Sequence, residues 1–227
     1  MVATPIGNLH DLSRRALETL QKADVIVCEN NRVSSVLLRA YEIQKPLVGL
    51  HEHASPERLA NLTEQLLAGK NLAYISDAGT PGVSDPGGKL AAAALEQGIQ
   101  VSPIPGPSAM AAAISICGFP MHEFTFMGFV PKKKGRESFF KELAERSSAS
   151  IFYESKYRMD KTLEALAKHL APERLILVAR ELTKLHETLY RGTIAQVTEQ
   201  IHKTSSKGEF VIVVAPIGFE SLRSGNS

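Results

Sequence analysis

The chain has 227 residues, of which 44% are hydrophobic and 22% are charged, and its formal net charge is +2. This composition is typical of a globular protein and excludes a wholly disordered chain. No apolar run reaches the ~18 residues of a membrane-spanning helix, and the N-terminus lacks the pattern of a signal peptide. We therefore expect a cytoplasmic protein without a membrane partner. The two cysteines, Cys28 and Cys117, lie far apart in the sequence and indicate neither a metal site nor a disulfide framework.

Positive charge is concentrated in the second half of the chain. Residues 1–118 contain nine Lys and Arg against eleven Asp and Glu, so residues 119–227 hold the excess of positive charge. A polyanionic partner is therefore expected to meet the second half.

Short apolar strands alternate with amphipathic helices in the first half. Buried strands are predicted at Val25–Cys28, Leu47–Leu50, Leu72–Ile75 and Val101–Ile104. Helices are predicted at Ser55–Ala68, which ends before Gly69, and at Leu90–Gln97, which ends before Gly98. This alternation predicts a parallel sheet covered by helices.

The pattern changes near Phe119. Beyond it, we expect strands that are more exposed and more alternating, at Phe124–Phe129, Ser150–Tyr153, Leu175–Ala179 and Phe210–Val214. Helices are expected between them, at about 136–146, 157–170 and 193–203, with Gly192 as a turn residue. The sequence thus predicts two α/β domains, residues 1–118 and residues 119–227.

Glycine and proline cluster where the strands of the first domain end, at residues 4–8 (TPIGN), 76–88 (SDAGTPGVSDPGG) and 105–109 (PGPSA). Ligands of open α/β sheets bind beyond the carboxyl ends of the strands, where glycine permits close approach and a helix start offers free N–H groups. One such loop is explained by a tight connection alone, but three at one edge favour a ligand site. The absence of G-x-G-x-x-G and G-x-x-x-x-G-K-[ST] argues against a dinucleotide or P-loop site.

Six motifs occur in order along the chain: VATPIGNL, SDAGTPGVSDPG, PIPGPSA, IFYESKYR, VARELTKLHET and KGEFVIVV. Together they resemble the ribosomal RNA small subunit methyltransferase I family of the tetrapyrrole-methylase-like superfamily. The resemblance implies two α/β domains of tetrapyrrole-methylase type with S-adenosylmethionine in a cleft between them, usually in a homodimer. It also implies 2′-O-methylation of a cytidine ribose in 16S ribosomal RNA of the small (30S) subunit.

The sequence departs from the family pattern at three places. Residues 29–32 read Glu-Asn-Asn-Arg where the family usually has Glu-Asp-Thr-Arg, so one carboxylate is missing from the mouth of the implied cleft. The first strand is reduced to Met1 and Val2, which indicates a trimmed or misassigned start. Many relatives carry a further C-terminal segment, whereas this sequence stops at Ser227; if that segment helps to hold RNA, we expect weaker affinity here.

The resemblance assigns the cofactor to residues of both domains. The expected cofactor residues are Pro5, Asp77, Ala78, Gly79, Thr80, Ser108, Ala109, Phe152, Tyr153, Glu181 and Gly208. Ser108 and Ala109 stand at a helix start, where backbone N–H groups meet polar atoms. Phe152 and Tyr153 are expected to flank the adenine, although Phe152 is equally well explained as core.

Transfer of a methyl group to a ribose hydroxyl needs aligned reactants and is helped by a general base. The candidates are Glu29, His51, His53 and Glu154, at or just after predicted strand ends. Both histidines are equally well explained as surface-loop residues, and without a third ligand at usable spacing they predict no metal. The choice of base stays open, as does a mechanism that relies on orientation and leaves the proton to water. Arg32 is also a candidate catalytic residue, and it is a candidate contact to the RNA backbone.

RNA contacts are expected at the basic run Lys132, Lys133, Lys134 and Arg136, and at Arg158 and Lys184. A solvated charged loop is the alternative explanation of the run. Two other functions compete: methylation of a small molecule such as a tetrapyrrole, and non-catalytic ribosome binding, which Asn30 and Asn31 would motivate. The cations favour the RNA methyltransferase.

Overall fold

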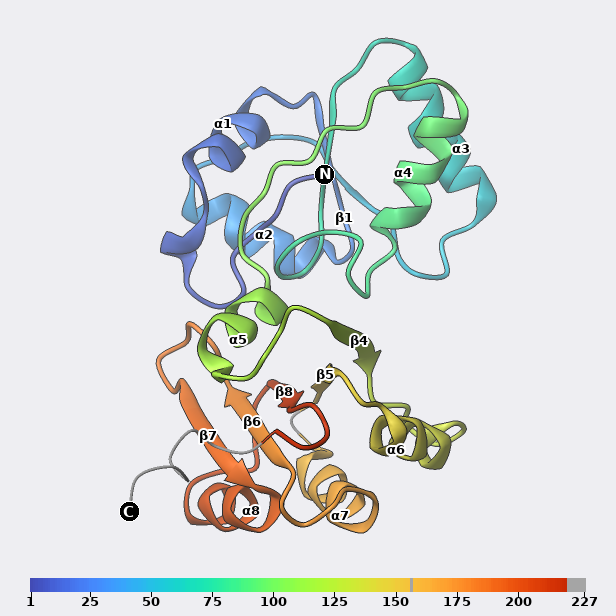
Figure 1. The fold of residues 1–227 in the computed structure, drawn as a ribbon. Helices are drawn as coiled ribbons and strands as arrows, with labels where there is room; N and C mark the ends of the chain where they lie inside the picture. Colours follow the sequence, from blue (N-terminus) through green and yellow to red (C-terminus); the bar gives the residue numbers. More distant parts are fainter. Residues whose placement is uncertain (156, 220–227) are drawn as a thin grey trace. The chain divides into compact units, whose positions relative to one another are not determined.

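The computed structural model describes residues 1–155 and 157–219, and the chain forms two compact units, Met1–Ser108 and Ala109–Ser227 (Figure 1). The division lies before Ala109, whereas the sequence pattern predicts it after Gly118. The reason is that helix α5 (Ala109–Cys117) packs against strand β8 (Phe210–Val214) of the second unit.

The first unit contains a parallel sheet, as the alternation of strands and helices predicts. Its strands follow the order β2 (Leu47–Gly49), β1 (Val25–Cys28) and β3 (Leu72–Ile75). The expected strand at Val101–Ile104 does not form; only Ile104 makes an isolated bridge, with Val2. Pro103 and Pro105 flank Ile104 and have no N–H to donate, which prevents a regular ladder.

Helices cover both faces of this sheet (Figure 1). The short 3-10 helix η1 (Leu9–Asp11) precedes α1 (Arg14–Lys22), and the other helices are α2 (Asn31–Ala40), α3 (Pro56–Leu67) and α4 (Gly87–Glu96). Ile26 and Cys28 pack under α1 and α2, whereas Val25 and Val27 pack under α3 and α4. The split follows from the alternation of side chains along β1.

The second unit contains a mixed five-stranded sheet in the order β4-β5-β8-β6-β7. The strands not yet bounded are β4 (Phe124–Phe129), β5 (Ala149–Glu154), β6 (Leu175–Arg180) and β7 (Thr188–Thr193). Two expectations were wrong. β7 was missed, and Gly192, expected in a turn, lies inside it. The central strands β5, β8 and β6 are almost fully buried rather than exposed.

Three helices bury one face of this second sheet: α6 (Arg136–Glu145), α7 (Met159–His169) and α8 (Ile194–Lys203). Their apolar residues join Phe152, Ile212 and Val178 from the central strands in one core. The helices match the three expected from the sequence within a few residues.

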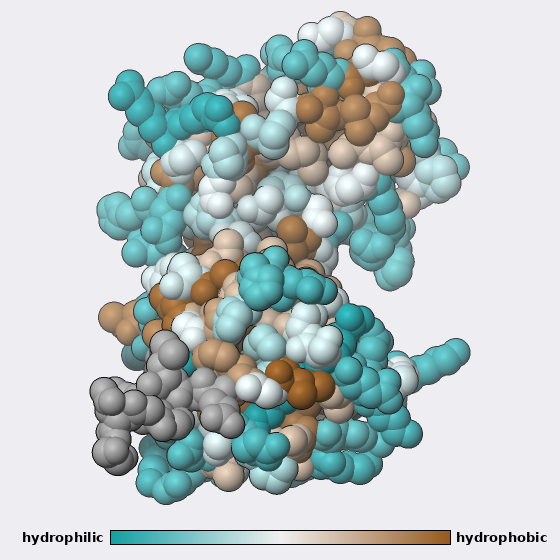
Figure 2. Space-filling view, viewed as in Figure 1, coloured by the Kyte–Doolittle hydropathy of each residue, from teal (hydrophilic) through white to brown (hydrophobic). Residues whose placement is uncertain are grey.

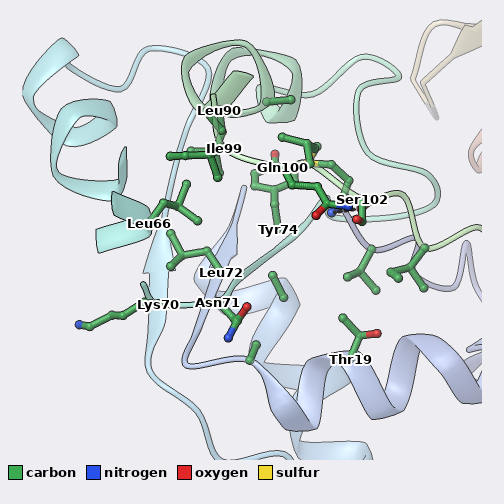
Figure 3. A pocket seen from close by; sticks show the side chains of 18 of the residues that line it. Thr19, Leu66, Lys70, Asn71, Leu72, Tyr74, Leu90, Ile99, Gln100 and Ser102 are labelled. Carbon is green, nitrogen blue, oxygen red and sulfur yellow. Dashed lines mark hydrogen bonds between the residues drawn. The ribbon is translucent and has the colours of Figure 1, made fainter. Parts of the chain in front are cut away.

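A hollow of about 660 Å³ lies beside β3 in the first unit. Leu66, Leu72, Leu90 and Ile99 are among the residues that line it (Figure 3). On this side of β3 the N–H of Val2 donates to the Tyr74 carbonyl at 2.9 Å, and no further strand of the described residues pairs there. The hollow does not include Asp77–Thr80, so it is separate from the glycine-rich loops.

Hydrophilic and hydrophobic residues are mixed over the face shown in Figure 2. Among the described residues, no helix combines the length and apolar character required to cross a membrane.

Candidate active site

The three glycine- and proline-rich loops of the first unit meet beyond the sheet. Thr4 and Gly79 exchange backbone hydrogen bonds of 3.0 and 3.1 Å, and the Thr80 hydroxyl donates to the Pro107 carbonyl at 3.0 Å. Gly79 has φ +81°, and a Cβ there would lie 3.3 Å from Ile6. The expected convergence of the loops at one edge is therefore confirmed, and Gly79 is required by both backbone conformation and close approach.

Two carboxylates stand at this edge, one after β1 and one after β3. Burial raises the pKa of Glu29, and nearby Asp77 raises it further. Asp77 is exposed, but partial desolvation at the loop edge still raises its pKa, although a hydrogen bond from the backbone of Asn30 opposes the rise. Like charges held near each other disfavour ionisation. The edge therefore has a negative potential suited to a cationic or hydroxyl-bearing ligand.

Asn30 and Asn31 replace the acidic and hydroxyl residues of the family pattern, and both have structural roles. Asn30 is the N-cap of α2, and its side chain accepts from the Arg32 N–H at 3.0 Å. Asn31 accepts from the Cys28 thiol at 3.1 Å. Because Asn and Asp cap helices equally well, the change at residue 30 removes a charge but keeps the local fold.

Other expected residues of this unit differ in accessibility. Arg32, His51 and His53 are exposed, Pro5 and Ser108 are half-buried, and Asp77 and Ala78 are exposed. His53 lies in the loop that follows β2. Ala109 begins α5 and belongs to the second unit.

Phe152 and Tyr153 point to opposite sides of β5. Phe152 is completely buried, and its ring lies 5.4 Å from that of Phe139, so its expected place beside an adenine is corrected to the core. Tyr153 is partly exposed and packs edge-on against Phe126 and Phe129, at 4.9 and 5.3 Å. Burial raises the pKa of its phenol. Of the two aromatic residues, only Tyr153 is accessible to a ligand.

Glu154 is enclosed by partners, although the sequence offered it as a base. Its side chain is fully buried and pairs with Arg158 at 2.6 Å and with Arg136 at 3.6 Å. It also accepts from the Thr162 hydroxyl and from the Ser155 N–H, each at 2.6 Å. A general base has to reach the proton it removes. Its enclosure therefore disfavours Glu154 as the base.

The expected RNA-binding cations fall into two groups. Lys132, Lys133 and Lys134 are exposed, and within the described residues no ion pair involves them. Arg136 and Arg158 instead turn inward to Glu154. Because a paired guanidinium attracts phosphate less strongly, the lysines are the better candidates for RNA.

Lys184 is also paired, in a tight loop at the end of β6. It lies 3.2 Å from Glu181 and 2.7 Å from Glu209. Gly208 has φ +140°, and a Cβ there would come within 3.0 Å of the Glu181 side chain. Glu181 itself has φ 51°, a left-handed conformation that is costly for a residue with a side chain. Lys184 and Gly208 thus hold the Glu181 side chain in place.

The profile of the Tetrapyrrole (Corrin/Porphyrin) Methylases matches residues 1–198. Ribosomal RNA small subunit methyltransferase I of Synechocystis is 43% identical over 95% of this chain and 77% of its own length. The proteins of the same name from Thermotoga maritima and Haemophilus influenzae are 39% and 44% identical, over 96% and 77% of their lengths. The chain belongs to the ribosomal RNA small subunit methyltransferase I family of tetrapyrrole methylases. This confirms the resemblance read from the six motifs.

Solved structures agree on the fold. Uroporphyrin-III-C-methyltransferase from Thermus thermophilus has a TM-score of 0.65 at 20% identity, covering 94% of this chain and 92% of the other. The methyltransferase CobJ has a TM-score of 0.66 at 20% identity, covering 98% and 97%. At this identity the likeness shows the tetrapyrrole methylase fold alone.

Two residues of this family member's site regions were missed from the sequence. Thr162 is a buried polar residue that joins Arg136 to Glu154. Arg158 is the N-cap of α7 and Thr162 lies one turn later, so their four-residue spacing is a helical signal. Glu154 ends a strand, and no helical spacing in the sequence places it beside them. Asp85 accepts from the N–H groups of Gly82, Val83 and Gly87, which folds the long glycine-rich loop.

Proposed function

We propose that this chain is an S-adenosylmethionine-dependent methyltransferase that methylates the 2′-hydroxyl of a cytidine ribose in small-subunit ribosomal RNA. The observation that carries the proposal is the meeting of three glycine- and proline-rich loops at the carboxyl edge of a parallel sheet. Sequence relatives named for small-subunit ribosomal RNA methylation, 39–44% identical over most of the chain, support the substrate. Activity on ribosomal RNA corresponds to a cytoplasmic enzyme.

The residues at the loop edge fit S-adenosylmethionine. Its sulfonium and ammonium groups are cationic and its ribose carries hydroxyl groups, which match the Glu29 and Asp77 carboxylates. Gly79, with its left-handed backbone, permits a ligand to approach the main chain closely. Asp77–Thr80, Pro5 and Ser108 are the residues of the first unit that would hold it. We also propose cofactor contacts for the residues of the second unit that the family resemblance implies, namely Ala109, Tyr153, Glu181 and Gly208. When bound, the cofactor supplies a methyl group activated by the sulfonium.

Glu29 is the base that the arrangement favours. It stands at a strand end, it is half-buried, and burial together with Asp77 raises its pKa. A higher pKa makes a carboxylate a better proton acceptor, provided that it stays ionised at working pH. Arg32 follows on the first turn of α2 and is proposed to contact the RNA backbone. Orientation of the cofactor methyl group and the ribose hydroxyl supplies the remaining acceleration.

Lys132–Lys134 are proposed to bind RNA phosphates. Each is exposed and adds a cation to a unit that carries net positive charge. Each phosphate neutralised releases about one counterion, so affinity falls steeply with salt.

The deciding experiment measures transfer of a tritiated methyl group from S-adenosylmethionine to purified 30S subunits. We expect label in one cytidine 2′-O-methyl position of the RNA. Label in a porphyrinogen and none in 30S subunits would support the tetrapyrrole alternative. Binding to 30S subunits without any transfer would support a non-catalytic protein and overturn the proposal.

The lysine contribution is measured with the triple variant Lys132→Ala, Lys133→Ala, Lys134→Ala. We expect weaker RNA binding and a salt slope reduced by about two to three, with cofactor affinity unchanged. The matched control replaces Lys22, Lys70 and Lys161, three other exposed lysines, and keeps the net charge of the two variants equal. Equal slopes in the two variants would show that the run is not a specific phosphate contact.

We also propose that the chain acts as a homodimer, as the family resemblance implies. Light scattering on the purified protein is expected to give twice the chain mass of 24.7 kDa. A single-chain mass at micromolar concentration would contradict it.

A further inference from the structure

The buried cluster around Glu154 connects two helices to the segment that carries the lysines. Glu154 ends β5, Arg136 begins α6, and Arg158 precedes α7. Thr162 completes the cluster, because it accepts from Arg136 at 2.9 Å while donating to Glu154. The carboxylate thus holds two guanidinium groups at the start of two helices.

Both arginines also bind the main chain just before the lysines. Arg158 donates to the Val130 carbonyl at 2.9 Å, and Arg136 donates to the Pro131 carbonyl at 3.4 Å. These two carbonyls immediately precede Lys132. The cluster therefore fixes the beginning of the segment Pro131–Gly135, which we call the lysine loop.

The far end of the lysine loop is fixed as well. The Arg136 N–H donates to the Lys133 carbonyl at 3.2 Å, and Gly135 turns the chain with φ +86°. Around α6 the molecular surface is hydrophilic (Figure 2). The loop therefore presents exposed lysines on a backbone held at both ends, which lowers the entropy lost when a partner orders it.

The fixed conformation of the lysine loop depends on the Glu154 carboxylate. The side chains of Arg136 and Arg158 are each only 20% exposed, so without the carboxylate two cations would face each other in a poorly solvated cluster. Their contacts to Val130 and Pro131 would then be lost or weakened.

We propose that Glu154 is a positioning residue for RNA binding: through Arg136 and Arg158 it holds the lysine loop in the conformation that binds phosphate. The role in RNA binding rests on the proposed function, whereas the effect on loop conformation does not. Glu154 contacts neither the RNA nor the reacting atoms in this role.

The first test is limited trypsin digestion of the full chain, because trypsin cleaves after lysine. In Glu154→Gln we expect cleavage after Lys132–Lys134 to accelerate by at least about fivefold relative to cleavage after Lys70, since local opening raises accessibility. Lys70 is an exposed lysine of the first unit and serves as the internal reference. An unchanged ratio of the two rates would overturn the proposal, whether or not the chain binds RNA.

The second variant is Arg158→Met, in case Glu154→Gln unfolds the second unit. It removes the contact to Val130 but leaves Arg136 paired with Glu154, so we expect a smaller acceleration at the same sites. Glu137→Gln is the matched control, because it breaks an exposed ion pair of α6 with Lys168. Equal acceleration in the control would contradict a specific role of the Glu154 cluster.

The third test is RNA affinity, and its sign is diagnostic. Glu154→Gln removes a negative charge, so electrostatics alone predicts tighter RNA binding, whereas positioning predicts weaker binding. We expect about a tenfold loss, and we expect the triple lysine substitution to cost less in this variant than in the wild type. Tighter binding, or fully additive losses, would overturn the role in RNA binding. Absence of RNA binding by the wild type would contradict the proposed function. The digestion result would still test whether Glu154 holds the lysine loop in place.

The last measurement separates positioning from base catalysis. At saturating RNA and cofactor, Glu154→Gln is expected to keep most of kcat and the pH dependence of the wild type. A large loss of kcat with an altered pH profile, at unchanged RNA affinity and digestion pattern, would identify Glu154 as the base instead.

Discussion

The two units build their candidate binding regions in different ways. In the first unit the loops are shaped by the main chain, through Gly79, through prolines and through backbone bonds such as that between Thr4 and Gly79. In the second unit the lysine loop is shaped by charged side chains gathered on Glu154. Within the described residues of the first unit, Glu29 and Asp77 form no ion pair, although Asp85 accepts three backbone N–H groups of its own loop. In the second unit the Glu154 carboxylate is paired with two arginines. Charged residues in the two units are therefore not equivalent functional candidates.

The largest effect is expected where the first unit has no room for a side chain. In Gly87→Ala the new Cβ would lie 2.5 Å from the buried Tyr74 ring and 2.7 Å from Asp85. We expect a loss of about 3 kcal/mol in the free energy of unfolding, measured by urea denaturation. Gly88→Ala is the control, since nothing lies within 4 Å of its added Cβ. Equal stability of the two variants would show that packing of the main chain does not limit this unit.

The second unit should respond to a change that preserves shape but removes hydrogen bonds. Thr162→Val deprives Glu154 and Arg136 of a shared partner, and we expect a loss of about 2 kcal/mol in the free energy of unfolding. Thr63→Val is the control, because the Thr63 hydroxyl bonds only the Leu59 carbonyl within its own helix. A loss in the control as large as in Thr162→Val would argue against the charged cluster as the source of stability.

The smallest effect concerns the carboxylates of the first unit. The pKa of Asp77 is higher in the folded protein than in the unfolded chain, so ionisation of this carboxyl group opposes folding. The stability that the protonated carboxyl group contributes at low pH is therefore lost as pH rises through the raised pKa. Asp77→Asn is therefore expected to stabilise the apo protein by a few tenths of a kcal/mol near neutral pH, because Asp77 is exposed and screened.

The gain from Asp77→Asn should disappear as pH falls below the ordinary range of aspartate, about 3.9. Thermal denaturation at several pH values measures it. A stabilisation that is independent of pH would mean that the charge of Asp77 is not its cause. The same variant should bind the cofactor more weakly, which calorimetry can measure.

Much of the fold was predictable because apolar periodicity and helix boundaries are local signals. The strands Val25–Cys28 and Leu72–Ile75 have the predicted bounds, and the helix expected at Ser55–Ala68 spans Pro56–Leu67. The strand containing Gly192 was missed because glycine and exposed polar residues hide an edge strand in the sequence.

The candidate site was predictable only where the main chain builds it. The glycine- and proline-rich loops can be recognised in the sequence, and Gly79 and Pro107 from two of these loops lie close together as expected. The orientation of a charged side chain carries no such mark. Glu154, Arg136 and Arg158 each have the residue type of a functional group, and only the structure shows that they bind one another where β5 ends and α6 and α7 begin.

The hollow beside β3 has a practical consequence for handling the protein. The amino group of Met1 donates to the Ser102 carbonyl at 3.0 Å and lies at the lining of this space. Any peptide that precedes Met1 would therefore meet the lining of this hollow, next to a strand edge that can pair with added backbone. Preparations that differ ahead of Met1 are thus not interchangeable in stability measurements, and they should be compared before any mutant is assessed.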